Sequence, residues 1–171
     1  MARLFGTDGV RGVAGRELTA SLAMEVGAAA AMVLAAETHK KPLVIIGRDT
    51  RASGDLLEAA AAAGLCAVGA DVLLLGVVPT PAVAYLVQRY HADAGVMLSA
   101  SHNPYEFNGI KLFGPKGFKL TDAEEDRIEE LVRSGRALDG QKSGGEVGRI
   151  SRAQSAAEDY TAFLASHYRG G

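Results

Sequence analysis

Short apolar runs alternate with helical patterns along this chain, and this alternation is the feature that most limits its fold. The runs cover residues 43–46, 72–75, 95–98 and 110–113, and each is followed at once by glycine or serine. The first three are continuously apolar, which is typical of strands covered on both faces. Strands of this kind occur in parallel sheets that lie between layers of helices.

Helical periodicity fills the segments between the runs. Apolar residues recur every three or four positions over residues 18–33, and residues 53–69 are rich in alanine with leucines on one face. Prolines open a third helix near residue 80, Thr121 and Glu124 form a capping box for a fourth, and a last helix is expected over about 153–167. The pattern predicts an α/β fold, a three-layer α/β/α sandwich with a mixed, largely parallel sheet.

Two segments depart from the regular alternation. Asn108 and Gly109 form a strong turn signal before the fourth run, which predicts either a local hairpin or a mixed edge of the sheet. Residues 134–151 are rich in glycine, serine and charge, which is typical of an exposed loop. We therefore expect one α/β unit over residues 1–150, and a helix in residues 151–171 that marks a boundary.

Charge and composition exclude several classes of partner. The net charge of −2 offers no basic field for nucleic acid. The apolar stretch 59–70 is shorter than a membrane span, which needs about 20 residues. The first residues lack the apolar core of a signal peptide, and the single cysteine, Cys66, excludes an internal disulfide. A cytoplasmic protein without nucleic-acid or membrane partners is expected.

The first candidate site segment is FGTDGVRG, residues 5–12. Its glycines stand three apart, with Asp8 and Arg11 between them. Such a loop can bring backbone N–H groups close to an anion, and the Arg11 guanidinium adds a fork of donors that suits phosphate. A simple glycine-rich turn is the alternative interpretation.

A second segment follows the first apolar run directly. It places Arg48 and Arg51 on either side of Asp49, beyond the carboxyl end of a predicted strand. Ligands of α/β sheets bind at this edge, so two arginines suit an anionic substrate. Structural ion pairing within the loop explains the same residues equally well.

The sharpest segment is SASHNP, which leaves the third apolar run at its carboxyl end. It gathers Ser101, His102 and Asn103, while Lys111 returns on the next strand towards the same edge. A serine in this place is a candidate nucleophile, although the sequence lacks the G-x-S-x-G elbow of many serine hydrolases. The alternative is a turn in which serine and asparagine satisfy backbone groups.

Taken together, these segments resemble the first domain of the α-D-phosphohexomutase superfamily. Three motifs stand in the order and spacing of that domain, and the resemblance covers essentially the whole chain. They are FGTDGVRG, the segment 47–51, and SASHNP followed by NGIK. The sequences of FGTDGVRG and SASHNP look most like those of the members that act on glucosamine phosphates. The resemblance implies interconversion of glucosamine 6-phosphate and glucosamine 1-phosphate through a phosphoserine and glucosamine 1,6-bisphosphate, in UDP-N-acetylglucosamine and cell-wall precursor synthesis.

The resemblance also implies a role for each matching residue. Ser101 would carry the phosphoryl group, and one Mg²⁺ would be bound through that phosphate. Lys111 is implied as a candidate general base, and His102 as the residue that orients the loop. Phosphate and substrate would be met by Arg11 and Asn103, with Arg48 and Arg51 lining the cleft less directly. Ser99 is expected to be structural.

Superfamily members are more than twice as long as this chain and have four domains around one cleft. The Asp-rich metal loop, the sugar-reading loop and a phosphate-binding loop belong to the other three domains. This chain is therefore expected to be the amino-terminal domain, with residues 151–171 leading towards the second, and to be inactive alone. Its partners would be those domains and a sugar phosphate. The alternatives are a relative acting on mannose or glucose phosphates, and a non-catalytic sugar-phosphate-binding module.

Overall fold

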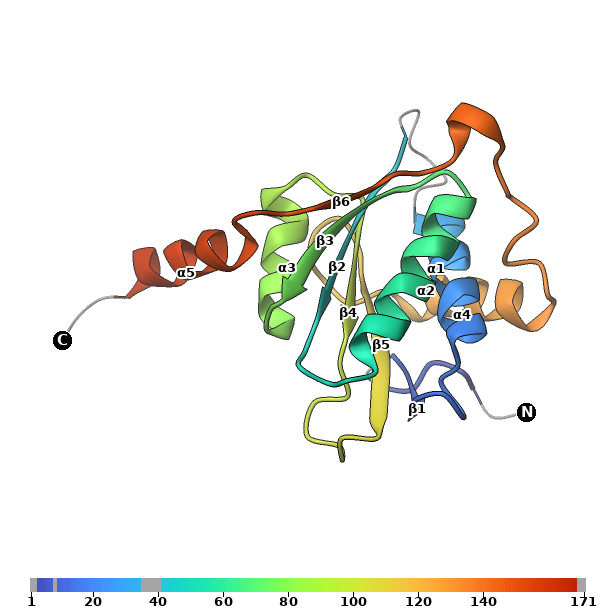
Figure 1. Ribbon diagram of the computed structural model, residues 1–171, viewed down its shortest axis with the longest axis horizontal. Coiled ribbons are helices and arrows are strands. Elements are labelled where there is room, and N and C mark those ends of the chain that lie inside the picture. Colours follow the sequence, from blue (N-terminus) through green and yellow to red (C-terminus); the bar gives the residue numbers. More distant parts are fainter. Residues whose placement is uncertain (1–2, 8, 35–40, 169–171) are drawn as a thin grey trace.

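A mixed sheet of six strands forms the middle layer of the residues described, which are 3–7, 9–34 and 41–168 in the computed structural model (Figure 1). The strands are β1 (Val10–Val13), β2 (Leu43–Arg48), β3 (Asp71–Val77), β4 (Ala94–Leu98), β5 (Phe107–Phe113) and β6 (Ile150–Arg152). Their order across the sheet is β1-β5-β4-β2-β3-β6.

The strand directions make the sheet mixed but largely parallel. β2 pairs in parallel with β3 and β4, and β6 in parallel with β3, whereas β5 is antiparallel to both β4 and β1. The three continuously apolar runs are the central strands, and every residue of β4 is buried. The predicted fold class is therefore confirmed, because strands enclosed by helices need apolar side chains on both faces.

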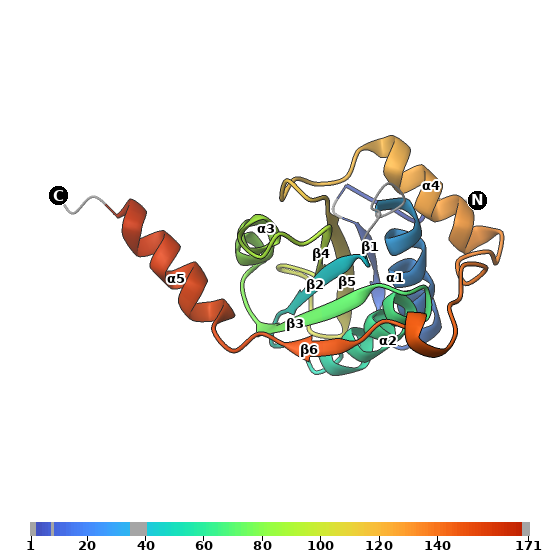
Figure 2. The same ribbon diagram turned by 90° about the horizontal axis from the view of Figure 1, so that it is seen from above.

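Helices cover both faces of the sheet, as Figure 2 shows from above. They are α1 (Ala20–Leu34), α2 (Gly54–Ala67), α3 (Thr80–Arg89), α4 (Asp122–Arg133) and α5 (Ala156–His167). One apolar cluster joins α1, α2 and α4 to one face of the sheet, and a second joins α3 to the other. Within the described ranges, no helix is long and apolar enough to cross a membrane.

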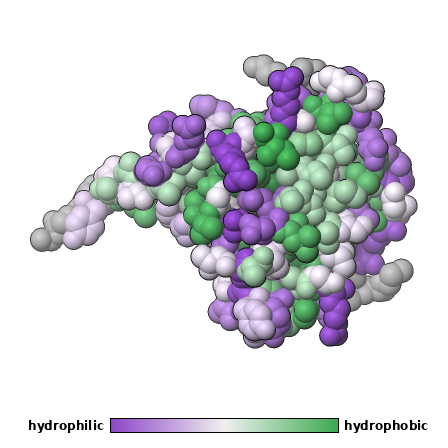
Figure 3. Space-filling view, in the orientation of Figure 1, coloured by the Kyte–Doolittle hydropathy of each residue, from purple (hydrophilic) through white to green (hydrophobic). Residues whose placement is uncertain are grey.

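The alanines and glycines of α1 and α2 allow these helices to pack closely. A Cβ atom added to Gly64 would overlap the carbonyl oxygen of Met24, and one added to Gly27 would lie 2.6 Å from the carbonyl oxygen of Ala61. On its outer side α2 exposes Ala59 and Ala63, and the surface there is pale green in Figure 3. Alanine thus supports helix formation, while the two glycines permit the close approach of α1 and α2.

The last helix, α5, lies beside α3 and projects away from the sheet (Figure 1). The rings of Tyr85 on α3 and Phe163 on α5 stack with centroids 4.0 Å apart. Strand β6 lies just before α5 and joins β3, so the predicted boundary between residues 150 and 151 falls within a strand. Residues 134–151 were expected to form an exposed loop throughout, and this expectation is wrong at β6. The strand has a single apolar residue and is exposed, so no apolar run marks it.

The turn signal at Asn108 and Gly109 lies inside β5 and not in a turn. Both predicted outcomes are found, because β5 is antiparallel to its neighbour β4 along the chain and makes that side of the sheet mixed. Only the turn signal at Asn108 and Gly109 is wrong, since both residues lie within the strand. The Asn108 side chain is buried, its Nδ2 donates to Ser53 Oγ over 2.9 Å, and its Oδ1 accepts from the Gly109 N–H. These tertiary contacts satisfy the amide that would otherwise stabilise a turn.

The amino-terminal segment is attached to α4 through Glu129. Its carboxylate accepts from the backbone N–H groups of Leu4 and Phe5 over 2.8 and 3.4 Å, and pairs with Arg133 Nε at 2.6 Å. Burial acts to raise the pKa of this carboxyl, but the hydrogen bonds from Arg133, Leu4 and Phe5 together outweigh it. The pKa of Glu129 therefore lies below its ordinary value.

Replacing Glu129 by glutamine is expected to lower the free energy of unfolding by about 1.5–3 kcal/mol at pH 7, because hydrogen bonds to a charged group contribute that much. A carboxyl with a lowered folded-state pKa stabilises the fold above its unfolded-state pKa of about 4.3, and this stabilisation is lost as the pH falls through the folded-state pKa. Urea titrations should therefore show the difference between variant and wild type shrinking as the pH falls below the unfolded-state pKa and disappearing once Glu129 is protonated in the folded state. The exposed neighbour Glu130, replaced in the same way, is the control. A difference that persists unchanged in acid would contradict the role of the charge.

Candidate active site

Two loops meet at the carboxyl edge of the parallel strands, the lower edge in Figure 1. One follows β2 at Asp49, and the other, residues 99–106, connects β4 to β5. We call the second the serine loop. The Asp49 N–H donates to the carbonyl of Leu98 over 3.0 Å, and the Ser99 N–H donates to the carbonyl of Gly109 over 3.0 Å. The two predicted segments therefore adjoin, because parallel neighbours end at the same edge.

Ser101 is the exposed serine of the serine loop, and its backbone is unusual. Its φ angle is 55°, in the left-handed region that residues other than glycine rarely adopt. Such a conformation costs on the order of 1–3 kcal/mol and persists only where the surroundings hold it. Its N–H donates to Ser99 Oγ over 3.1 Å, and its Oγ lies 3.5 Å from His102 Nδ1. The hydroxyl thus stands at the surface beside an imidazole.

Ser99 is buried and engaged within the protein. It is 5% exposed, and its Oγ donates to Asp49 Oδ2 over 2.8 Å while accepting from the Ser101 N–H. A hydroxyl that both donates and accepts a hydrogen bond inside the fold is poorly placed to attack a ligand. This geometry separates two serines that strand alternation leaves equivalent.

The Arg51 side chain is turned inward onto the serine loop and is only 10% exposed. All five of its N–H groups donate within the protein at 2.6–3.0 Å. The acceptors are Asp49 Oδ2 and the backbone carbonyls of Ser101, Asn103, Pro104 and Phe107.

Arg11 and Asn103 come together at the same edge. Arg11 lies on β1 opposite Gly109 of β5, and its Nη1 donates to Asn103 Oδ1 over 3.4 Å. The structure therefore joins the first candidate segment to the serine loop through a guanidinium group. Asp8, the acidic residue of that segment, lies outside the described residues.

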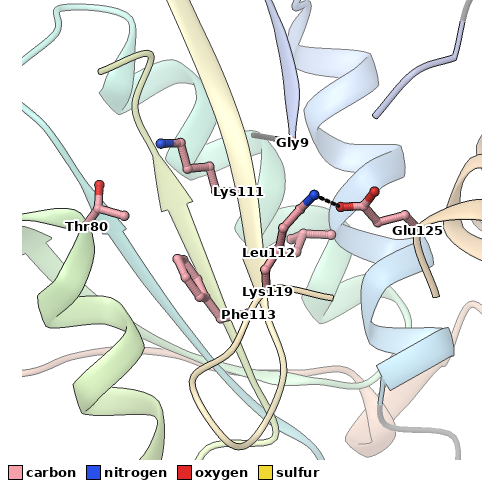
Figure 4. A pocket seen from close by; sticks show the side chains of 7 residues that line it. All are labelled: Gly9, Thr80, Lys111, Leu112, Phe113, Lys119 and Glu125. Atoms are coloured by element: carbon pink, nitrogen blue, oxygen red, sulfur yellow. Dashed lines mark ion pairs between the residues drawn. The ribbon is translucent and has the colours of Figure 1, made fainter. Parts of the chain in front are cut away.

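Lys111 lies on the same sheet face as Arg11, because it stands two residues along β5 from Gly109. Phe113, two residues further, packs with the α3 cluster, so this is the face that α3 covers. Figure 4 shows Lys111 pointing away from a neighbouring pair, Lys119 with Glu125, whose Nζ and Oε1 are 3.3 Å apart. These residues line a pocket of about 210 Å³.

Arg48 points to α2. Its Nη2 lies 2.7 Å from Asp55 Oδ1 and its Nε 3.7 Å from Glu58 Oε2. Burial raises the pKa of Glu58, even though the charge of Arg48 acts to lower it. These contacts fit the structural ion-pair interpretation, and they direct Arg48 to the helix rather than to the serine loop.

Asp49 is the site residue whose role the sequence did not indicate. Besides accepting from Ser99 and from Arg51 Nε, it accepts from the Arg51 N–H over 3.0 Å. Its position between two arginines was the only available signal, and it suggested an ion pair rather than a contact with the serine loop. In the part of the chain that the structure describes, no three His, Cys, Asp or Glu side chains gather as a metal would require.

The fold and the serine loop define an α/β/α domain that presents a hydroxyl at the carboxyl edge of its sheet. The family described as phosphoglucomutase/phosphomannomutase, alpha/beta/alpha domain I, matches residues 2–139. The chain belongs to the phosphoglucomutase/phosphomannomutase family.

Individual relatives agree with this assignment. The chain is 55% identical over 170 residues to a phosphoglucosamine mutase of Acetivibrio thermocellus, covering 99% of this chain and 38% of the relative. It is 59% identical over 161 residues to a phosphoglucosamine mutase of Mycobacterium marinum, covering 94% of this chain and 36% of the relative. A phosphoglucomutase/phosphomannomutase family protein of Burkholderia thailandensis superimposes with a TM-score of 0.78 at 26% identity, over 97% of this chain and 36% of that one. The chain thus spans little more than a third of these proteins.

Proposed function

We propose that this domain carries the phosphoryl group of a phosphoglucosamine mutase, which interconverts glucosamine 6-phosphate and glucosamine 1-phosphate through glucosamine 1,6-bisphosphate. The observation that carries the proposal is the exposed hydroxyl of Ser101, on a loop whose backbone is hydrogen-bonded by Arg51. Relatives named phosphoglucosamine mutase at 55% and 59% identity support the choice of sugar. The product would enter UDP-N-acetylglucosamine and cell-wall precursor synthesis.

Phosphoryl transfer depends on positioning and charge more than on covalent chemistry. In the proposed step the bond between phosphorus and Ser101 Oγ breaks, and a bond from phosphorus to a sugar hydroxyl oxygen forms. Ser101 Oγ leaves with the electron pair of the broken bond and takes a proton from the solvent to which it is exposed. The proton of the sugar hydroxyl passes to the amine of Lys111, the proposed general base. Arg11 supplies positive charge to the transferring group, where such charge stabilises the transition state.

The other proposed residues act around this step. His102 orients the serine loop beside Ser101, and Asn103 meets the substrate together with Arg11, its hydrogen-bond partner. Arg51 stands behind the serine loop and Arg48 faces α2, in keeping with a less direct part of both in binding.

One Mg²⁺ is part of the proposal, because a metal on a phosphoryl oxygen stabilises phosphoryl transfer. The described residues would contribute a single ligand, an oxygen of the phosphate on Ser101, since they hold no ready group of metal-binding side chains. The further ligands would come from the remaining domains of the polypeptide. The proposed location is the cytoplasm, where the lone buried Cys66 would remain reduced.

The test of the proposed function is a mutase assay of the full-length protein with the 6-phosphates of glucosamine, glucose and mannose. Turnover is expected to be fastest with glucosamine 6-phosphate. Preference for mannose or glucose would favour the second candidate, a phosphomannomutase or phosphoglucomutase, which the matching family description also supports. Phosphate binding without turnover would favour a sugar-phosphate-binding module.

The 171-residue chain alone is expected to melt in one cooperative thermal transition and to show no mutase turnover. The reason is that it has a complete sheet with helices on both faces, but spans little more than a third of its relatives. Calorimetry and the same sugar-phosphate assay check the two halves of this prediction. Turnover by the isolated chain would show that the other domains are not required.

A further inference from the structure

We propose that Arg51 is a positioning residue, which holds Ser101 in its reactive conformation and does not bind substrate phosphate. The proposal deepens the proposed function and rests on it for the identity of the reaction. Its basis is the convergence of the Arg51 guanidinium and the Asp49 carboxylate on the backbone of the serine loop.

The guanidinium of Arg51 has no donor left for a substrate. A guanidinium group offers five N–H groups, and all five have acceptors inside this protein. A phosphate could bind Arg51 only by displacing a loop carbonyl or Asp49 from it. Because the side chain is 10% exposed, a displaced carbonyl would also have little water to replace the lost bond.

The peptide groups on both sides of Ser101 are fixed by this arrangement. Arg51 Nη2 holds the Ser101 carbonyl over 2.9 Å, and Ser99 Oγ holds the Ser101 N–H over 3.1 Å. Ser99 is in turn held by Asp49, which also accepts from Arg51 Nε over 3.0 Å. One arginine therefore anchors the loop directly through carbonyls and indirectly through Asp49 and Ser99.

This anchoring explains how Ser101 remains at a φ angle of 55°. The left-handed conformation is unfavourable for serine, and it persists only if the surroundings hold both flanking peptide groups. The conformation in turn fixes the direction of the hydroxyl. Arg51 thus acts on the reaction through the direction of Ser101, and a displacement of about 1 Å in a reacting group can cost about 100-fold in rate.

Lysine cannot replace arginine in this role. Its three donors lie on one nitrogen atom, which cannot reach four carbonyls and a carboxylate that surround a planar fork. Arg51→Lys keeps the positive charge but loses the geometry, so it separates positioning from charge.

The experiment uses the full-length protein with Arg51→Lys, and with Arg136→Lys as the matched control. Arg136 is 63% exposed and pairs with Asp139 at 3.3 Å, so the control makes the same change in a surface ion pair. Two readouts are taken, the kcat and KM for glucosamine 6-phosphate, and hydrogen–deuterium exchange of the peptide covering residues 99–107. We expect Arg51→Lys to lower kcat by about 100-fold with KM changed less than about threefold, and to speed exchange of that peptide by about tenfold. The control should match wild type in both.

The opposite results overturn the proposal. A raised KM with unchanged kcat would make Arg51 a substrate ligand, and unchanged exchange of the loop peptide would show that Arg51 does not hold the loop.

If Arg51→Lys does not fold, Asp49→Asn takes its place, since it keeps the shape of the side chain but removes the charge that holds Ser99 and Arg51. Asp49→Asn should also lower kcat more than it changes KM and should speed exchange of the loop peptide, each by a smaller factor than Arg51→Lys. A wild-type kcat and wild-type loop exchange in Asp49→Asn would refute the proposal. Wild-type protein without turnover would disprove the proposed function alone, because the exchange readout still judges the anchoring.

Discussion

Replacing Ser101 by alanine in the full-length protein is expected to lower the mutase rate by about 10⁴-fold or more, the scale of loss when a covalent nucleophile is removed. Replacing Ser99 by alanine is expected to cost about tenfold. The two residues stand two positions apart on one loop, so each substitution is the control for the other.

The difference between these serines comes from their surroundings. The Ser101 hydroxyl is at the surface with His102 beside it, and its removal takes away the oxygen that carries the phosphoryl group in the proposed reaction. Ser99 is buried, and its removal leaves Asp49 and the Ser101 N–H without one hydrogen bond each. A buried group left in this way costs about 1–3 kcal/mol, which affects stability and loop geometry but not the chemistry itself.

Peptide mapping by mass spectrometry and steady-state kinetics check this prediction. The phosphate should be found on Ser101 in the wild-type protein and should be absent from the serine-loop peptide of Ser101→Ala. A phosphate mapped to Ser99, or nearly normal turnover by Ser101→Ala, would show that the assignment is wrong.

Replacing Lys111 by glutamine is expected to lower kcat by roughly 10²–10⁴-fold, the contribution of a positioned general base. Lys111 lies on the α3 face of β5, and its side chain points away from the Lys119–Glu125 pair. Its side-chain nitrogen is therefore not the partner of that carboxylate. Lys116→Gln, at an exposed position after the end of β5, is the matched control and should retain wild-type kcat.

A second substitution at the same position distinguishes the two chemical roles of Lys111. Arginine keeps the positive charge but cannot lose a proton in a protein. If Lys111 is the general base, Lys111→Arg should be as impaired as Lys111→Gln. Recovery of most of the rate in Lys111→Arg would assign a purely electrostatic role. Wild-type kinetics in Lys111→Gln would remove the residue from the site.

The fold was predictable where neighbouring residues alone determine the structure. The apolar runs became β2, β3, β4 and β5, and the capping box at Thr121 closes the first turn of α4, with Thr121 Oγ1 accepting from the Glu124 N–H over 3.3 Å. Both signals act over a few residues, so no knowledge of the rest of the chain is needed. The short strands β1 and β6 have no such signal, because they exist only through pairing with β5 and β3.

By itself, the sequence determined the α/β class, the central strands, the helices and the family resemblance, together with the expectation that the serine loop lies at the carboxyl edge. The tertiary structure alone decided how the polar residues of that edge are connected. Arg51 reaches carbonyls 50 to 56 positions away in the sequence, and Asp49 reaches Ser99 across 50. The sequence pattern of an arginine beside an aspartate is identical whether the arginine donors face a ligand or a loop. Hydrogen bonds of this kind depend on distance and direction in space, and these are set only when β2 and β4 pair side by side.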